Sequence, residues 1–211
     1  MEELYRPGPP AALDAVTTQL NRQGYAIVPA FFSPALVRGL RRELLWRDGR
    51  GEFDEAAIGQ GETHQKRLDI RGDRTCWLSG GSLAQRRLAV QMEALRQAVN
   101  QSLGLGLFEL ESHFAIYEPG AGYQRHLDTF SRDAARQLSV VIYLNDDWRE
   151  QDGGHLRLWP AADASEHLPD VAPAAGTLAC FLSAQIPHAV CVTQRTRYSI
   201  AGWFRRRSQR W

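Results

Sequence analysis

The sequence lacks the features by which membrane and exported proteins are recognised. No apolar run approaches the roughly 20 residues that a helix needs to cross a bilayer. The first ten residues, MEELYRPGPP, contain no basic segment followed by an apolar one. These absences predict a protein that is neither exported nor bound to a membrane, and we expect it in the cytoplasm as a monomer.

Cysteine is scarce, and neither sign of charge prevails. The three cysteines, Cys76, Cys180 and Cys191, show no CxxC spacing, and their odd number argues against a disulfide framework. We therefore expect buried free thiols in a reducing compartment. The 211 residues include 25 Lys and Arg against 24 Asp and Glu, a formal charge of +1. That balance provides no general attraction to nucleic acid or to an anionic membrane, and it favours a small-molecule or protein substrate.

The one local excess of charge is at the end of the chain, FRRRSQRW, with Arg205, Arg206, Arg207 and Arg210. A short basic stretch is typical of a solvated terminus, and a contact with an acidic protein partner is the alternative. Nucleic-acid binding is disfavoured because the charge does not extend over a face and no recognised binding motif accompanies it.

The first half of the chain is predicted to be helical. Apolar residues recur at helical spacing in residues 9–24, 31–46 and 82–104. Ser33 is a suitable N-cap for the second helix, because Pro34 follows at the first helical position. The first and third helices are expected to end at Gly24 and Gly104.

The second half reads as a succession of short strands. Apolar segments separated by Gly, Pro, Asn and Asp are expected at residues 108–118, 122–128, 137–145, 154–160, 176–182, 188–193 and 197–204. This pattern is typical of an all-β sandwich or jelly roll, with the N-terminal helices on one outer face of the sheet. No linker or internal repeat divides the chain, so we expect one domain over residues 1–211, with helical support in 1–105 and the jelly-roll core in 106–204.

A polar, glycine-rich segment lies between the second and third helices. It spans about Gly49 to Ile70 and is too long for an inert connection in a compact domain. Gly59 and Gly61 would let its backbone move, as a closing lid requires. A functional loop that is mobile over about residues 56–66 without substrate is therefore one hypothesis, and a disordered insertion is the other.

Three side chains have the chemistry of a metal site. His126 and Asp128 stand two positions apart in YQRHLDTF, and alternate side chains of a strand point to the same face. His188 begins a later strand, sixty-two residues beyond His126. Two histidines and one carboxylate form the facial triad of non-haem Fe(II) oxygenases, which leaves coordination positions open.

The other histidines are interpreted as ordinary surface or hydrogen-bonded residues. They are His64, His113, His155 and His167. His188 differs from them because Arg197 follows nine residues later on the next expected strand. An arginine there would place a cation near the metal.

Five segments together resemble a known family. They lie over about residues 68–204 and are, in chain order, LDIRGDRTCWL, YEPGAGYQRHLD, VVIYLNDDW, GGHLRLWP and PHAVCVTQRTRYSIAGWF. They are similar to segments of the 2-oxoglutarate- and Fe(II)-dependent oxygenases of the prolyl-hydroxylase type, which include the hypoxia-inducible-factor prolyl hydroxylases and bacterial relatives acting on elongation factor Tu. The resemblance implies a double-stranded β-helix, that is, a jelly-roll barrel whose open end holds the iron.

The resemblance also implies roles for individual residues. It makes His126, Asp128 and His188 the catalytic iron ligands, and it places Arg197 and Tyr143 against the distal carboxylate of 2-oxoglutarate, with Tyr117 in the same pocket. A guanidinium is suited to that role because its forked donors match a carboxylate. Fe(II), 2-oxoglutarate and O2 would be required, with ascorbate added in assays. Because Asp128 is present where halogenating relatives have a small residue, the resemblance implies hydroxylation, with release of succinate and CO2.

The substrate is less sharply indicated. The segment from Gly49 to Ile70 occupies the place of a finger loop that closes over peptide in similar enzymes. The resemblance implies six substrate-binding residues, which are Arg71, Asp73, Trp77, Tyr123, Arg136 and Trp203. Together they favour a prolyl residue of a protein, with trans-4-hydroxylation of elongation factor Tu as the specific expectation. A hydroxylase of a free amino acid or other metabolite is the alternative, and a silent binding module is disfavoured because all three ligands and the arginine are kept.

Overall fold

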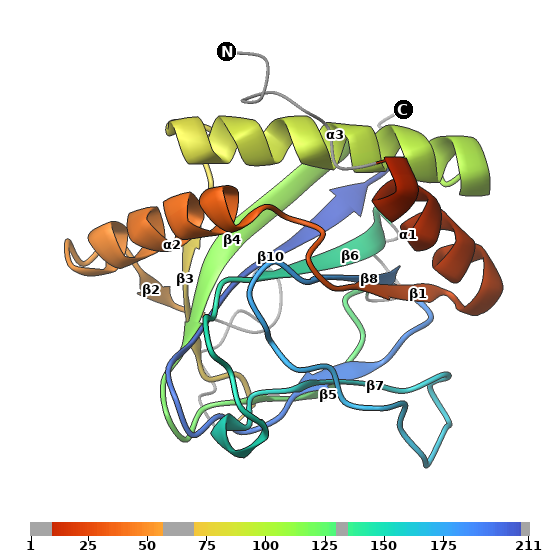
Figure 1. Ribbon diagram of the computed structural model, residues 1–211. Helices are drawn as coiled ribbons and strands as arrows, with labels where there is room; N and C mark the ends of the chain where they lie inside the picture. The colour runs from red at the N-terminus through yellow and green to blue at the C-terminus, as the bar shows by residue number, and fades with distance from the viewer. Residues whose placement is uncertain (1–9, 57–69, 130–134, 208–211) are drawn as a thin grey trace.

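The computed structural model describes residues 10–56, 70–129 and 135–207. Within these ranges, three α-helices pack against one of two facing antiparallel sheets (Figure 1). The helices are α1 (Pro10–Gln23), α2 (Pro34–Asp48) and α3 (Leu83–Leu103). This arrangement confirms the expected jelly-roll class with helices on one outer face of the sheet.

The predicted helix signals act as expected. The Ser33 hydroxyl accepts a hydrogen bond from the Leu36 amide at 3.3 Å, and the Ser82 hydroxyl accepts one from the Gln85 amide at 3.0 Å. An N-cap of this kind contributes about 1 kcal/mol to helix stability. At the end of α3, Gly104 has a φ of 62°, a left-handed conformation that glycine adopts without strain.

The ten strands found in the described part of the chain form a large and a small sheet. The large sheet has the order β1-β8-β6-β10-β4-β3-β2, and the small sheet has the order β5-β9-β7. The large sheet contains β1 (Tyr25–Val28), β2 (Asp54–Glu55), β3 (Asp73–Trp77), β4 (Glu109–Tyr117), β6 (Arg136–Tyr143), β8 (Leu178–Leu182) and β10 (Arg197–Arg205). The small sheet contains β5 (Tyr123–His126), β7 (Leu156–Leu158) and β9 (His188–Val190). Between β6 and β7 lies the 3-10 helix η3 (Glu150–Asp152).

Each of the seven expected strands overlaps a strand of the structure, but β1, β2 and β3 were not predicted. These three are short or polar, and each is a strand because a neighbour offers it a hydrogen-bonding edge. β8 pairs with β1, β4 pairs with β3, and β3 in turn pairs with β2. β2 lies within the segment from Gly49 to Ile70, so part of the expected loop is paired structure. The hypothesis of a mobile lid at residues 56–66, with Gly59 and Gly61, lies outside the described residues except at Ala56.

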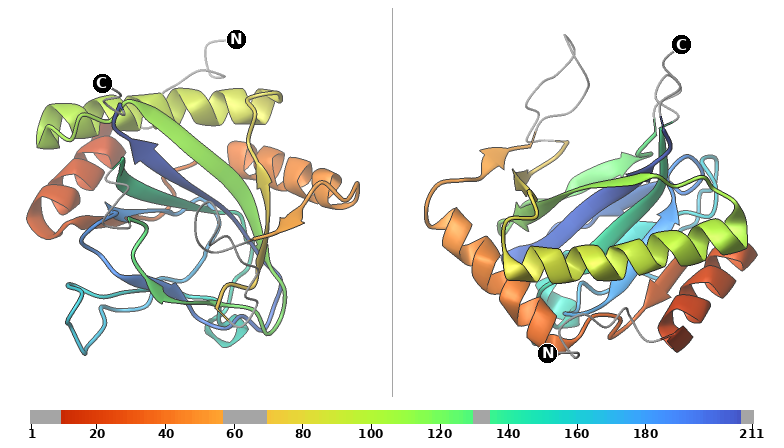
Figure 2. Two further views of the ribbon diagram at one scale, coloured as in Figure 1. Left: turned by 180° about the vertical axis from the view of Figure 1, so that it is seen from behind. Right: turned by 90° about the horizontal axis from the view of Figure 1, so that it is seen from above.

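Alternation along the strands separates two layers of packing. One face of the large sheet packs against the helices, for example through Phe114, Ile142 and Ile200 with Leu40 and Leu95. Burying a large apolar side chain contributes about 1.5–3 kcal/mol, so this layer is the main source of stability. The opposite face looks toward the small sheet, and Figure 2 shows the two sheets and the helical layer from behind and from above.

The structure also tests the expectations about thiols and termini. Cys76 and Cys180 are buried, whereas Cys191 is only partly buried. Of the basic C-terminal residues, Arg206 and Arg207 are exposed as expected, and Arg206 also donates to the Leu105 carbonyl, whereas Arg205 at the end of β10 is half-buried and lies within hydrogen-bonding distance of Glu111. Arg210 lies outside the described residues. Among the helices that the structure describes, none has the length and apolar character to cross a membrane.

Candidate metal centre

A cavity of about 480 Å³ lies between the two sheets. Its walls include side chains of both sheets, and polar and charged groups are numerous among them. A polar cavity inside a β-structure departs from the apolar packing of an ordinary core, so it marks the place where a ligand would bind.

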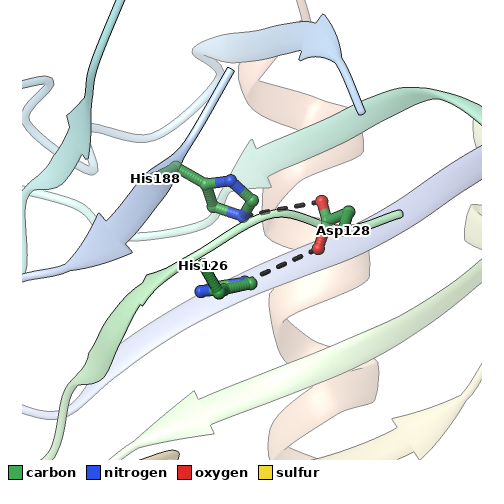
Figure 3. A group of neighbouring side chains, drawn as sticks. All are labelled: His126, Asp128 and His188. Carbon is green, nitrogen blue, oxygen red and sulfur yellow. Dashed lines mark ion pairs between the residues drawn. The ribbon is translucent and has the colours of Figure 1, made fainter. Parts of the chain in front are cut away.

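His126, Asp128 and His188 meet at this cavity (Figure 3). One potential ligand atom from each side chain lies within 4.8 Å of the other two. The Nε2 atom of His126 is 3.6 Å from Oδ1 of Asp128, and that of His188 is 3.5 Å from Oδ2. Among the residues that the structure describes, this is the one group of three or more such side chains placed to hold a metal ion.

The register of the small sheet explains why the histidines meet. His126 on β5 and His188 on β9 are direct partners across the antiparallel pair, and their ring centroids are 4.2 Å apart. Asp128 comes from beyond the end of β5, which stops at His126. The expectation that His126 and Asp128 share one continuous strand face is therefore wrong, although both reach the same point.

Hydrogen bonds orient the three side chains. The Nδ1 atom of His126 lies 2.7 Å from the Gln124 carbonyl oxygen, and that of His188 lies 3.3 Å from the Ile186 carbonyl oxygen. An Nδ1–H that donates to a carbonyl leaves Nε2 with a free lone pair toward a metal. On Asp128, Oδ2 accepts a hydrogen bond of 2.6 Å from the Ser139 hydroxyl of β6, which ties the ligand to the large sheet.

The electrostatics favour the protonation states that bind a metal. Burial lowers the pKa of His188 to about 4, so its imidazole is neutral at pH 7. Burial by itself would raise the pKa of Asp128, but the neighbouring His188 and His126 and the Ser139 hydroxyl hold it below its usual range. The neutral imidazole of His188 and the ionised carboxylate of Asp128 are donors that suit Fe(II).

Arg197 lies at another part of the same cavity and is 1% exposed. Its Nε donates to the Gly154 carbonyl at 2.8 Å, and one terminal nitrogen donates to the Ser199 hydroxyl at 3.1 Å. A guanidinium has five N–H groups, so donors remain for a ligand. Gly154 is required here because a Cβ at its position would lie 3.0 Å from Cδ of Arg197.

Two tyrosines flank this arginine. The Arg197 guanidinium carbon lies 5.2 Å from the ring centroids of both Tyr117 and Tyr143. The Tyr143 hydroxyl is buried and has no hydrogen-bond partner among the described residues. An unpaired buried hydroxyl beside an arginine fits a carboxylate ligand, which would accept from both groups. Burial raises the pKa of Tyr143 to about 12, so the hydroxyl retains its proton for donation.

Three of the expected substrate-binding residues form one chain of contacts that ends at a metal-site histidine. Arg71 donates two hydrogen bonds to the buried Asp73 carboxylate, at 2.7 and 3.0 Å. The Arg71 guanidinium lies 5.1 Å from the Tyr123 ring centroid, and that ring stacks on His126 at 3.7 Å. These contacts show that Arg71, Asp73 and Tyr123 support the site, whether or not they also touch a substrate.

The other three expected substrate-binding residues lie along one wall of the cavity. Arg136 stacks on Trp203 at 3.7 Å and donates to Glu111 at 2.8 Å. Trp77 is 56% exposed and lies next to His113, with 5.0 Å between the ring centroids.

The interpretation of His113 as a surface or hydrogen-bonded residue is wrong. Its side chain is buried, and neither ring nitrogen has a hydrogen-bond partner among the described residues. By contrast His167 matches that interpretation, because it is partly exposed and its Nδ1 lies 2.7 Å from the Leu168 carbonyl oxygen. His155 is intermediate in exposure, and His64 lies outside the described residues.

Sequence reasoning missed the residues that support the site from neighbouring strands. These are Ser139, Ser183, Ser199 and Gly154, together with His113. A usable signal was present for Ser139 and His113, because each is a polar residue at an inward position of a strand whose other positions are largely apolar. The contacts themselves join residues distant in the chain and have no local signature.

A jelly-roll cavity that combines a two-histidine, one-carboxylate centre with a buried arginine defines a class of protein, the mononuclear non-haem iron oxygenases. The family model of the 2OG-Fe(II) oxygenase superfamily matches residues 112–205, which include every one of these groups. The chain belongs to this superfamily and is of the prolyl-hydroxylase type. Fe(II), 2-oxoglutarate and O2 are the cofactor and cosubstrates of that family, as expected.

Solved structures support the fold and the type. A prolyl-4-hydroxylase from Pseudomonas putida is 43% identical, has a TM-score of 0.81, and is matched over 93% of this chain and 100% of its own. A prolyl hydroxylase from Trichoplax adhaerens, solved with a peptide fragment of hypoxia inducible factor, is 28% identical with a TM-score of 0.81, over 92% of this chain and 88% of its own. These matches confirm the double-stranded β-helix.

A curated relative extends the same result. The hypoxia-inducible factor prolyl hydroxylase of Caenorhabditis elegans is 29% identical in a match that covers 92% of this chain. This chain spans only 28% of the length of that relative. The similarity therefore concerns the oxygenase region and not the whole of the longer protein.

Proposed function

We propose that this protein is an Fe(II)- and 2-oxoglutarate-dependent dioxygenase that hydroxylates a prolyl residue in a protein. The observation that carries the proposal is one cavity with two complementary ends. One end offers the triad of His126, Asp128 and His188, and the other offers Arg197 beside the unpaired hydroxyl of Tyr143. A metal and a dicarboxylic acid would satisfy these groups together.

In this proposal His126, Asp128 and His188 hold the metal, and Arg197 and Tyr143 bind the distal carboxylate of 2-oxoglutarate. Bound together with O2, Fe(II) and 2-oxoglutarate supply the oxidising power for hydroxylation of a C–H bond, with succinate and CO2 as coproducts. The chain's own part is to position these groups. Ser139 keeps Asp128 in place, and Gly154 and Ser199 keep Arg197 in place.

A protein substrate is supported by the exposed wall of the cavity and by the relatives. Trp77 is more than half exposed and lies next to His113, with the buried Trp203 and the half-buried Arg136 beyond it, which gives an aromatic wall open to a large ligand at Trp77. The structure of the Trichoplax adhaerens relative holds a peptide fragment. A free amino acid or other metabolite remains the alternative substrate, because the metal and cosubstrate ends of the cavity would serve either.

The specific substrate that we propose is a proline of elongation factor Tu, modified by trans-4-hydroxylation in the cytoplasm. The support is the resemblance of the chain to bacterial prolyl hydroxylases, to which the match with the Pseudomonas putida enzyme adds. Asp128 supports hydroxylation in preference to halogenation, because a carboxylate occupies the position that a halide would need.

The test is to incubate the purified protein with Fe(II), ascorbate, 2-oxoglutarate and elongation factor Tu from the same cell. We expect a mass increase of one oxygen atom on a proline-containing peptide, with succinate formed in equal amount. His188→Ala is the inactive control. Oxidation of free amino acids without any modified proline would overturn the protein substrate and support the metabolite alternative.

A further inference from the structure

His113 is a buried polar side chain for which the proposed mechanism has no use. It lies on β4, where His113, Ala115 and Tyr117 alternate toward the cavity and the intervening Phe114 packs toward the helices. Its side chain borders the cavity and the residue is 2% exposed. The Trp77 and Trp203 rings lie beside it, with centroid distances of 5.0 and 5.5 Å.

The imidazole of His113 has no partner of its own. Neither ring nitrogen makes a hydrogen bond to any residue that the structure describes, whereas the Nδ1 atoms of His126 and His188 each lie within hydrogen-bonding distance of a main-chain carbonyl. Burying a hydrogen-bonding group without a partner is destabilising, and native structures seldom do it without a reason. His113 is also not part of the metal group formed by the described residues.

The surroundings decide which kind of partner His113 can take. Burial, together with the positive charges of Arg71 and Arg136, lowers its pKa to about 4, and the carboxylates of Asp73 and Asp128 oppose this only in part. At pH 7 the ring is therefore neutral, with one nitrogen donating and the other accepting. Flanking indole rings offer no acceptor for the donor.

We infer that His113 donates a hydrogen bond to a main-chain carbonyl oxygen of the bound protein substrate, between the Trp77 and Trp203 rings. This inference rests on the proposed function, because it needs a peptide in the cavity. A prolyl residue has a carbonyl oxygen but no N–H, so a peptide that presents proline offers more acceptors than donors at this point. His113 then holds the peptide through its main chain.

The chemistry of the wall agrees with this assignment. Trp77, His113, Trp203 and Arg136 follow one another in contact, with the Arg136 guanidinium 3.7 Å from the Trp203 ring centroid. Flat aromatic rings pack well against the apolar pyrrolidine ring of proline and its neighbours. They also exclude water that would compete for the hydrogen bond of His113. In such a site one polar group fixes the direction of the chain.

The test compares His113→Met with wild type in the oxidation of elongation factor Tu. We expect KM for the protein substrate to rise about tenfold, the usual effect of leaving one hydrogen-bonding group unpaired. The KM for 2-oxoglutarate and the affinity for Fe(II) should stay unchanged. The melting temperature should stay level or rise, because the substitution removes an unpaired buried group. His113→Gln keeps a donor and should restore part of the lost affinity.

Controls separate the inference from the proposed function. His167→Met removes a partly exposed histidine outside the cavity, and it should match wild type in every measurement. If wild type oxidises the protein substrate and His113→Met has the same KM, the role of His113 is wrong and the proposed function stands. A His113→Met protein that fails to fold, or a His113→Gln protein as impaired as it, would indicate a structural role instead. A wild-type protein that oxidises no prolyl residue would overturn both proposals.

Discussion

The two faces of the large sheet come from the same strands, yet they carry opposite kinds of side chain. Along β6, Leu138, Val140 and Ile142 pack toward the helices, whereas Ser139 and Tyr143 border or face the space between the sheets. The helical face is apolar and filled. The other face contains hydroxyl, imidazole and guanidinium groups around a cavity.

Successive residues of one strand therefore serve different ends, because those facing the helices provide stability and those facing the cavity provide the chemical groups. Apolar burial against the helices provides the free energy of folding, which is roughly proportional to the area removed from water. That surplus allows the inner face to keep buried groups without partners, such as the Tyr143 hydroxyl and both nitrogens of His113. Substitutions on the helical face should therefore change stability, whereas substitutions on the inner face should change ligand binding and turnover.

The largest effect should come from removing a metal-site histidine on the inner face. His188→Ala should abolish metal binding and turnover while the chain still folds, because the helical face is untouched. Mn(II) binding and succinate formation measure the two losses, and His155→Ala is the matched control outside the cavity. Full activity in His188→Ala would show that the third ligand is another residue.

The next largest effect should come from Arg197→Ala. Losing one partner of a buried charge-assisted pair costs about 2–5 kcal/mol, so 2-oxoglutarate should bind far more weakly while metal affinity changes little. Isothermal titration of 2-oxoglutarate tests this, with Arg157→Ala as control, since Arg157 pairs with Asp170 on the surface. Equal titrations for Arg197→Ala and wild type would refute the cosubstrate role.

On the helical face, Ile142→Ala should lower stability and leave cosubstrate binding unchanged. Replacing a buried isoleucine with alanine typically lowers the free energy of unfolding by about 2–5 kcal/mol, because apolar burial is lost and a cavity is left. The KM for 2-oxoglutarate should remain that of wild type, although Ile142 is the chain neighbour of Tyr143. Urea denaturation gives the stability, and a change of KM without a change of stability would break the separation of the two faces.

The pH dependence of stability should report the unpaired His113. Burial lowers its folded pKa from 6.5 to about 4, so between these pH values the unfolded chain binds a proton that the folded chain does not. Metal-free wild type should therefore lose stability as the pH falls from 6.5 toward 4, with about 3 kcal/mol arising from this residue. His113→Met should show a shallower loss in urea titrations across this range, and parallel curves would contradict the expectation.

The smallest effect should come from Tyr143→Phe, the inner-face counterpart of Ile142→Ala. Removing one hydroxyl that would donate to the cosubstrate should weaken 2-oxoglutarate by about 1–2 kcal/mol. Stability should stay level or rise, because the hydroxyl has no partner among the described residues in the absence of ligand. Calorimetric titration and thermal denaturation of the same sample give both values.

The local parts of the structure could be read from the sequence. Ser33 and Gly104 predicted helix ends because caps act within a few residues, and the succession of short apolar segments predicted the jelly-roll class. Strands β1, β2 and β3 could not be predicted in this way. Their sequences are short or polar, and they become strands only when β8, β4 and β3 supply edges for β1, β3 and β2 respectively.

What the sequence determined by itself is the set of chemical groups and their approximate strands, including His126, Asp128, His188 and Arg197. Only the tertiary structure decided that the two histidines stand opposite each other in the small sheet, that Ser139 from the large sheet bonds Asp128, and that the other described residues leave Tyr143 and His113 without partners. The physical reason is the distance along the chain over which each kind of interaction acts. Caps and alternation depend on neighbours in the chain, whereas the burial and pairing of a side chain depend on residues that folding brings together from distant segments.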